Sequence, residues 1–391
     1  MKSLDEKLDL FREQWKNRKA RIMIIGLGSV GNYLLDYLMS AGDEEMEICV
    51  VGRNEEKMLS DVNIVKVSSL IRGQNKTKVT IIGGVDLNDV DAVFDAVTEF
   101  KPDIIVNSSR AYSGLKYGSI SWKSIRAYGI WTPLSIKYTK NIMAACQKTE
   151  LDMIVINTSY SDAVIPWLKS AGMNYPDFGS GNINHLVPRI KLAVAGRLGI
   201  KDYWNIDITF AVAHFHDVVI SKEGHTEGVD MLIDIRYAGE TLQVDQREIF
   251  SMCAIPMPVD AKRNMMNASS NFEIIKAIFS AVRDKNKVKL HCPGAFGEIG
   301  GYPVVIDGTG ENIHTYICED YFKLDSMIKK NHESIYLDGV EDIKEGVLIY
   351  TDELVDKVKN VFGVNLMKTV AFDEIESAAD FLIKNIIEKS M

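Results

Sequence analysis

The stretch that decides the fold is residues 21–42, RIMIIGLGSVGNYLLDYLMSAG. The apolar run Ile22–Ile25 predicts a short buried strand. Gly26, Gly28 and Gly31 then form a G-x-G-x-x-G turn, and the residues after the turn predict a helix. A strand, a glycine turn and a helix in this order are typical of the first unit of a Rossmann-type fold.

Each glycine of the turn has a physical role. The first permits the tight turn, the second lets the backbone approach a pyrophosphate, and the third lets the helix pack closely on the strand. Phosphate would lie at the start of the helix, where free amide groups and the helix dipole attract an anion. We therefore predict a nicotinamide dinucleotide site at Gly26, Gly28, Ser29, Val30 and Gly31, and a glycine turn without a ligand is the alternative.

The second predicted strand, EMEICVVGRN, ends without an acidic residue at the place that normally holds the ribose 2'-hydroxyl. Arg53 and Asn54 stand there instead, and an arginine accommodates a 2'-phosphate. This favours NADP over NAD, although NAD stays possible. The alternative is a solvated Arg53, with Glu55 or Glu56 reaching the ribose.

Strands and helices continue to alternate as far as about residue 160, which predicts a doubly wound parallel sheet. Further strands are predicted at 78–84, 103–109 and 152–159, with helices at 89–100 and 133–147. Polar residues follow these strands at the edge where ligands bind in such sheets. The cofactor candidates at this edge are Asp86, Ser108, Ser109, Asn157, Thr158 and Ser159.

Beyond residue 160 the pattern changes to neighbouring long strands, which predict an antiparallel or mixed sheet in a second α+β domain. We place an amphipathic N-terminal helix at 1–18, the dinucleotide-binding domain at 19–160, the substrate domain at 161–330 and a C-terminal strand with helices at 331–391. The C-terminal half is rich in apolar helices, which makes a homodimer plausible.

Composition narrows the class of partner. The net charge of −9 argues against nucleic acid and membrane surfaces, whose protein partners are basic, and favours a small molecule. The five cysteines form no C-x-x-C pair, which indicates a reducing cytoplasm and no zinc knuckle. No apolar run is long enough for a signal sequence or a membrane span.

Two family resemblances follow from these motifs. The segments GLGSVG, VVGRNEEK and DLNDVDAVFDAVTEFKPDIIVNSS resemble the NAD(P)-binding domain of saccharopine dehydrogenase-like proteins over about residues 20 to 110. This resemblance implies a nicotinamide cofactor and leaves the substrate open, because that family is diverse.

The middle of the chain resembles the lactate and malate dehydrogenases. The segments NTSYSDAVIPWLKSAG, FGSGNINHLVPRIKLAVAGRLGI, AVAHFHD and FEIIKAIFSAVRDKNKVKLHCPG occur in the order typical of those enzymes. The resemblance implies that Arg189 binds a substrate carboxylate and that His214 exchanges the proton. Two departures stand out: Leu186 replaces the aspartate that orients the histidine, and the flanking glycines are missing.

The pattern of residues does not by itself decide the role of the histidines. His214 and His216 alternate on a predicted strand and would share a face, with Asp217 beside them. One histidine as proton donor, an H-x-H metal pair, and two structural residues all fit, but a metal needs a third ligand that no spacing identifies. We predict His214 as the acid, His216 as a second candidate and no metal.

Arg189 opens a predicted helix, where it would grip a carboxylate or form an interdomain salt bridge. Tyr112 and Lys116 form a Y-x-x-x-K in a predicted loop, a spacing also found in short-chain dehydrogenases. Coincidence explains the motif, but the loop lies where a lid would cover an anionic substrate. The polar residues Asn182, Asn184 and His185 precede the helix, and capping accounts for at least one of them.

The leading hypothesis is a cytoplasmic NAD(P)-dependent oxidoreductase that transfers a hydride to or from a carboxylate-bearing carbonyl or imine. A saccharopine- or opine-type dehydrogenase acting on an amino-acid C–N bond is the alternative among enzymes. A dinucleotide-sensing protein without turnover is the alternative outside them, and the missing aspartate at Leu186 supports it.

Overall fold

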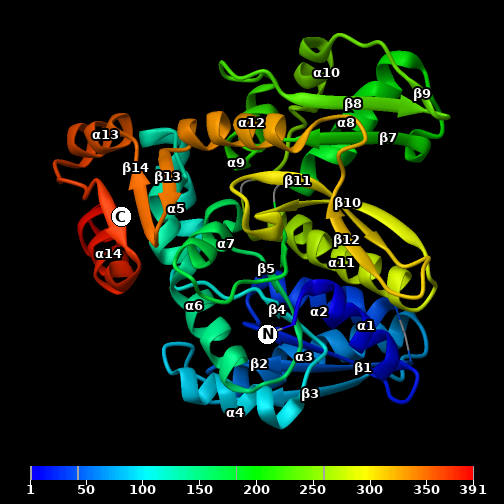
Figure 1. The fold of residues 1–391 in the computed structure, drawn as a ribbon. Coiled ribbons are helices and arrows are strands. Elements are labelled where there is room, and N and C mark those ends of the chain that lie inside the picture. Colours follow the sequence, from blue (N-terminus) through cyan, green and yellow to red (C-terminus); the bar gives the residue numbers. More distant parts are fainter. Residues whose placement is uncertain (1, 42–43, 182, 259, 391) are drawn as a thin grey trace.

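The glycine turn lies at the carboxyl edge of a six-stranded parallel sheet in the computed structural model, which describes residues 2–41, 44–181, 183–258 and 260–390 (Figure 1). The strand order is β3-β2-β1-β4-β5-β6. Because β1 has β2 on one side and β4 on the other, the chain order reverses at the glycine turn, which is where ligands bind in such sheets. The strands are β1 (Ala20–Ile25), β2 (Met46–Val51), β3 (Lys78–Ile82), β4 (Ile104–Asn107), β5 (Ile154–Asn157) and β6 (Phe178–Gly179).

Both faces of this sheet are covered, which explains its continuous apolar strands. Successive side chains of β1 enter opposite cores: Ile22 and Ile24 pack on the side of α2, and Met23 and Ile25 on the side of α4 and α6. The helices of this unit are α2 (Ser29–Ala41), α3 (Glu55–Arg72), α4 (Val90–Phe100), α5 (Gly114–Ile120) and α6 (Thr132–Lys148). The predicted doubly wound α/β fold is confirmed.

The N-terminal helix α1 (Leu4–Trp15) packs on the body as predicted. Ser3 and Glu6 form a capping box at its start, and Leu8 and Phe11 are buried in the core. An ion pair also anchors the helix, because the buried Lys7 Nζ lies 2.8 Å from an oxygen of Asp177. The helix is therefore fixed to the segment that leads into β6.

Smaller antiparallel sheets follow, as the sequence predicts. One contains β7 (Ile206–Ala211), β8 (Leu232–Tyr237) and β9 (Glu240–Thr241), and another contains β10 (Lys287–Pro293), β11 (Gly301–Asp307) and β12 (His314–Ile317). The helices are α7 (Ser161–Ser170), α8 (Ile183–Leu198), α9 (His214–Glu223), α10 (Gln246–Cys253) and α11 (Asn264–Val282).

The strand predicted to carry His214 and His216 ends before both residues. Ala211 is the last residue of β7 that pairs, because its partner strand β8 begins at Leu232. Ala213 keeps extended backbone angles, and His214 is the first residue of α9. His214 and His216 therefore lie on a helix, where residues two apart point in different directions.

The C-terminal part adds a third antiparallel sheet beside α6 and α7 (Figure 1, orange and red). It contains β13 (Val340–Lys344), β14 (Val347–Tyr350) and β15 (Thr369–Ala371), with α13 (Asp352–Phe362) and α14 (Ile375–Leu382). Helix α12 (Leu324–Leu337) precedes this sheet and contacts α9 and β13. It thus brings the start of the C-terminal part to the helix that carries His214. The domain boundaries given above stay predictions.

No helix in the described parts of the chain combines the length and the apolar character that crossing a bilayer requires.

Candidate functional site

A cavity of ≈ 810 Å³ extends along the carboxyl edge of the parallel sheet to helices α8 and α9. Gly26 and Gly28 line one end, and Arg189 and His214 line the other. The cavity therefore joins the predicted cofactor turn to the residues predicted for proton transfer and substrate binding.

The glycine turn has the shape that a dinucleotide phosphate requires. Gly26 has a φ of +90°, and a Cβ there would lie 2.9 Å from the Ser109 Cα. A Cβ on Gly31 would lie 2.3 Å from the Gly26 carbonyl oxygen, so Gly31 supports helix packing and does not line the cavity. A Cβ on Gly28 would meet no described atom within 4 Å, which leaves the backbone open to a ligand. Ser29 and Val30 also line the cavity.

Basic residues follow β2 at the same end. Arg53, Asn54 and Lys57 line the cavity, and the Asn54 Oδ1 caps α3 by accepting a hydrogen bond from the Lys57 backbone N–H at 2.9 Å. Glu55 and Glu56 are not among the described residues that line the cavity. Glu55 packs against Gly83 instead, where a Cβ would lie 2.3 Å from the Glu55 Cβ. This geometry does not support the alternative in which an acidic residue reaches the ribose.

Four of the six strand-end candidates line the cavity: Ser108, Ser109, Thr158 and Ser159. Asp86 and Asn157 do not, so their assignment to the cofactor is corrected. Asp86 accepts hydrogen bonds from Asn88 and closes a turn. Asn157 is fully buried and donates to the Ser161 Oγ at 3.0 Å, which fixes the start of α7.

The centre of the other end is a histidine–carboxylate pair. The His214 Nδ1 lies 3.1 Å from the Asp338 Oδ2, and the Asp338 carboxylate is fully buried. The same Oδ2 accepts a hydrogen bond from the Tyr160 hydroxyl at 2.7 Å, and Oδ1 accepts one from the Tyr128 backbone N–H at 2.7 Å. The His214 backbone N–H donates to the Asp162 Oδ1 at 3.0 Å. These bonds fix both the imidazole ring and the start of its helix.

The surroundings of His214 favour its protonated form. Burial alone would lower the pKa of His214, but the hydrogen bond that its ring donates to Asp338 and the charges of Asp338, Asp162 and Asp217 raise it above its ordinary value. The rings of Tyr128 and Tyr160 meet the imidazole edge-on, with centroids 4.9 and 5.2 Å away. The imidazole is thus held between two aromatic rings and a buried carboxylate.

Backbone geometry explains how Asp338 reaches the site. Asp338 ends α12, and Gly339 with a φ of +90° turns the chain away from the helix. The Gly129 N–H donates to the Asp338 carbonyl oxygen at 2.9 Å, and a Cβ on Gly129 would lie 2.5 Å from that oxygen. Tyr160 has a φ of 44°, a left-handed conformation rare for a non-glycine residue. The pair is therefore built by close backbone contacts between distant segments.

Arg189 lies in the second turn of α8 and lines the cavity; the helix begins at Ile183, earlier than predicted. Its Nη1 donates to the Cys253 carbonyl oxygen at 2.8 Å, and its Nη2 lies 3.0 Å from the Met257 sulfur. Among the described residues, none offers its Nε a hydrogen-bond partner. A guanidinium has five N–H donors, so Arg189 retains donors for a carboxylate.

The structure also places the other residues that the sequence analysis singles out. His216 does not line the cavity: its Nδ1 lies 2.7 Å from the Ser334 Oγ, and burial lowers its pKa to about 4. Leu186 is buried in an apolar cluster. Tyr112 lies in a loop and lines the cavity, whereas Lys116 belongs to α5 and its side chain lies outside those that the structure describes. Asn182 also lies outside the described residues.

The sequence gives little sign of Asp338, Tyr160 or His185. His185 lies inside α8 and lines the cavity, so it is not a residue before the helix as predicted. Asp338 stands in Leu337-Asp338-Gly339, a combination common at helix ends, and no local motif links it to His214. Only its three-dimensional position identifies it.

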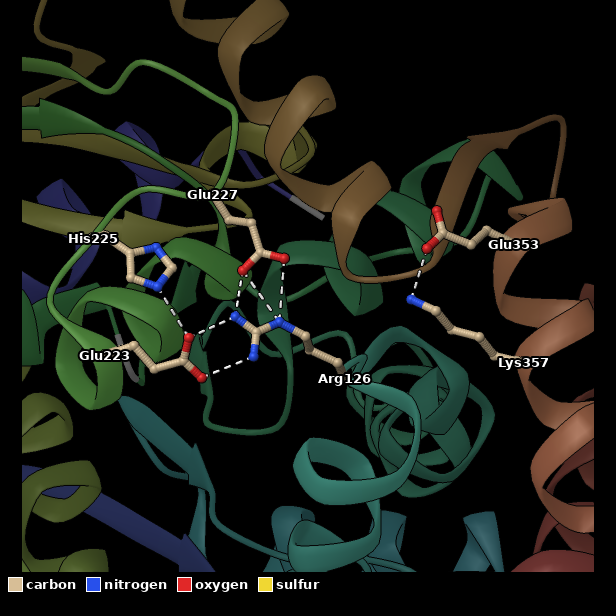
Figure 2. A network of polar contacts seen from close by, with 6 residues as sticks. All are labelled: Arg126, Glu223, His225, Glu227, Glu353 and Lys357. Atoms are coloured by element: carbon tan, nitrogen blue, oxygen red, sulfur yellow. Dashed lines mark hydrogen bonds and ion pairs between the residues drawn. The ribbon is translucent and has the colours of Figure 1, made fainter.

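Acidic side chains at and just after the end of α9 come together at Arg126 (Figure 2). The ligand atoms of Glu223, His225 and Glu227 lie within 4.8 Å of one another, a spacing that would suit a metal. Arg126, however, lies 2.6 Å from a Glu223 oxygen and also binds Glu227. Its guanidinium further lies 4.6 Å from the Trp122 ring centroid. The positive charge in this cluster is already supplied by the arginine.

Solved structures of dehydrogenases match this chain over most of its length. Lactate dehydrogenase from Eimeria maxima, solved with NADH and oxamate, matches with a TM-score of 0.53 at 15% identity, over 82% of this chain and 93% of that one. Malate dehydrogenase from Cryptosporidium parvum matches with a TM-score of 0.51 at 16% identity, over 82% and 98%. Malate dehydrogenase from Aeropyrum pernix matches with a TM-score of 0.51 at 17% identity, over 80% of this chain and 95% of that one.

The fold is that of the lactate and malate dehydrogenases. The predicted resemblance to these enzymes is confirmed for the fold. No protein-family model and no curated protein sequence matches the chain. The resemblance to saccharopine dehydrogenase-like proteins therefore receives no support and stays a prediction.

Proposed function

We propose that this protein is a dehydrogenase that interconverts a 2-hydroxy acid and a 2-oxo acid with a nicotinamide dinucleotide, and that it prefers NADP. The observation that carries the proposal is the His214–Asp338 pair, which shares one cavity with Arg189 and the glycine turn. Solved structures of this fold include a lactate dehydrogenase with NADH and oxamate, which supports the cofactor class and an acidic substrate.

The residues of the glycine turn fit the dinucleotide, because Gly28 leaves an open backbone at the start of α2. When bound, this cofactor supplies or accepts the hydride. Arg189 binds the substrate carboxylate through its remaining N–H donors and so sets the orientation of the neighbouring carbonyl. The anion also meets a basic surface, because Arg263 and Lys222 line the same part of the cavity.

His214 moves the proton. In the reducing direction, the carbonyl carbon gains a hydride, and protonated His214 gives its Nε2 proton to the carbonyl oxygen, which becomes the hydroxyl. In the oxidising direction, the neutral ring takes that proton back. Asp338 accepts from Nδ1–H, which makes Nε2 the nitrogen that gains and loses the proton. Asp338 thus fills the orienting role that the sequence assigns to no residue.

The NADP preference rests on the end of β2. Arg53 and Lys57 both line the cavity there, and a 2'-phosphate would bind two cationic side chains. A 2'-hydroxyl would normally be held by a carboxylate, and neither Glu55 nor Glu56 lines the described cavity.

The test is oxidation of NADPH and NADH, followed by absorbance, with pyruvate, 2-oxobutanoate and oxaloacetate. Each is supplied with and without ammonium or an amino acid. We expect turnover without the amine, and a loss of about 10²-fold or more in kcat/KM for His214→Ala. His216→Ala is the matched control, because His216 does not line the cavity.

Three outcomes would contradict the proposal. Turnover that requires the amine would indicate the saccharopine- or opine-type reaction. Tight NADPH binding without turnover on any acid would indicate a sensor. Full activity of His214→Ala would remove His214 as the acid.

A further inference from the structure

His185 is a buried side chain that the proposed mechanism does not use. It lies on α8 one turn before Arg189, is 9% exposed and lines the cavity. Within the described residues, its Nε2 has no hydrogen-bond partner. Leaving a buried nitrogen unpaired is unfavourable, so a ligand atom that pairs with it would be stabilised at this place.

The environment of His185 sets its protonation state. Burial, and then the charge of Arg189, lower the pKa of His185 to about 3, so the ring is neutral near pH 7. A hydrogen bond to the Met266 backbone opposes this shift. A backbone carbonyl that raises a histidine pKa accepts a ring N–H, and the other ring nitrogen, Nε2, is then an acceptor. His185 thus offers a neutral acceptor to the cavity.

Ser180 and Asp217 line the cavity as well, and together with His185 they form what we call the polar wall. Ser180 is 2% exposed and lines the cavity, and its Oγ has no partner among the described residues. Asp217 is 3% exposed, also lines the cavity, and accepts a hydrogen bond from the Ser221 Oγ at 3.3 Å. Arg189, which lies one helical turn after His185, lines the same cavity, and its charge shifts the pKa of both Asp217 and His185.

The charges select the chemistry of the missing group. Arg189 makes the potential at His185 positive, and Arg263 acts in the same direction. An ammonium group would be repelled there, and a methyl group would leave the Ser180 and His185 atoms unpaired. A hydroxyl is neutral, donates one hydrogen bond and accepts two, so it satisfies an acceptor and a hydroxyl donor together.

We infer that the substrate is a hydroxylated 2-oxo or 2-hydroxy acid, whose side-chain hydroxyl is bound by His185 and Ser180 beside Arg189. Asp217 is a second acceptor for the same group. The inference rests on the proposed function, because Arg189 and His214 define where the carboxylate and the reacting carbon lie. It adds a substrate preference: among such acids, the site would bind those that carry a side-chain hydroxyl.

The experiment compares acids that differ by one hydroxyl: 3-hydroxypyruvate against pyruvate, and 4-hydroxy-2-oxobutanoate against 2-oxobutanoate. We expect the hydroxylated member of at least one pair to have a kcat/KM higher by ~10²-fold or more, because sites built to bind a hydroxyl strongly reject the analogue without it. Ratios within about threefold in both pairs would overturn the inference, since water would then satisfy the wall equally well.

Variants assign the preference to residues. His185→Leu should reduce the hydroxyl preference at least about tenfold, since its acceptor is lost. His216→Leu is the matched control, because His216 is also a buried histidine with a lowered pKa but lies outside the cavity, so this variant should keep the ratio of the wild type. An equal loss on both acids of a pair in His185→Leu would contradict the assignment to His185.

Binding separates this inference from the proposed function. If none of the four acids is reduced, the proposed function fails. Calorimetric titration of the NADP⁺-saturated protein with glycerate and with lactate still tests the wall. Glycerate binding at least about tenfold tighter than lactate would support the inference. Equal affinities, or no binding of either acid, would overturn it.

Discussion

The two ends of the cavity are built in different ways. The cofactor end uses residues 26–31, and its shape comes from backbone contacts such as the approach of Gly31 to the Gly26 carbonyl. The proton-transfer end joins His214 to Asp338, which lie 124 positions apart in the chain. The first end follows from local chemistry, whereas the second exists only when three segments pack together.

The ends also differ electrostatically. At the cofactor end, the glycine turn and the exposed Arg53 line the cavity. At the other end, burial raises the pKa of Asp162 to about 6 and that of Asp217 to about 7, and these carboxylates surround His214. Changes in pH should therefore act on proton transfer through these carboxylates and His214.

The largest effect is expected from Asp338→Asn. Loss of the carboxylate removes the main interaction that raises the His214 pKa, so the protonated acid is lost at lower pH. We expect kcat/KM for reduction to fall by ~10²-fold, the contribution of a positioned general acid, and its alkaline limb to move to lower pH. The measurement is a pH profile of kcat/KM.

Asp342→Asn is the control for this variant, since Asp342 lies on β13 and does not line the cavity. Asp338→Glu keeps a carboxylate, so its alkaline limb should lie between those of Asp338→Asn and the wild type. An unchanged pH profile in Asp338→Asn would show that the two ends do not differ as described.

The next prediction distinguishes cofactor binding from helix packing at the cofactor end, with one glycine variant for each. Gly28→Ala places a methyl in open space, so the free energy of unfolding should change by less than ~0.5 kcal/mol. The NADPH dissociation constant should still rise at least about tenfold, because the methyl blocks the approach of the pyrophosphate. Gly31→Ala should instead destabilise the protein by ~1–3 kcal/mol through its contact with Gly26. Urea unfolding and fluorescence titration test both, and equal destabilisation by the two variants would contradict this division.

Arg53→Ala tests the basic end of the same half. The KM for NADPH should rise about tenfold while that for NADH stays within about twofold, because only the 2'-phosphate loses a charged partner. Lys148→Ala, at a lysine outside the cavity, is the control. Equal changes for both cofactors would argue against NADP preference.

The smallest effect concerns Glu227→Gln in the Arg126 cluster, which lies outside both ends (Figure 2). Partly exposed ion pairs contribute little, so the free energy of unfolding should fall by less than about 1 kcal/mol. Steady-state kinetics should show kcat/KM within about twofold of the wild type. A larger kinetic effect would extend the proton-transfer end to the segment that carries Arg126.

The sequence predicts the strand, the glycine turn and the helix of the cofactor end because these elements are contiguous in the chain. Strand, turn and helix follow from periodicity and three glycines. His214 and Arg189 came from a family resemblance, whereas the helix at His214 was missed because a short apolar run does not show where strand pairing stops. Asp338 could not be predicted, because its role depends on a turn at Gly339 and on packing against Gly129 and Tyr128.

The position of Asp338 also sets an order of events during biosynthesis. The strands of the parallel sheet end at Gly179, so the ribosome releases every strand of that sheet long before α12. A nascent chain can therefore form the dinucleotide turn while His214 still lacks its carboxylate partner. A chain that stops before Leu324 would lack both the carboxylate partner of His214 and the C-terminal residues that pack into the core on one face of the parallel sheet.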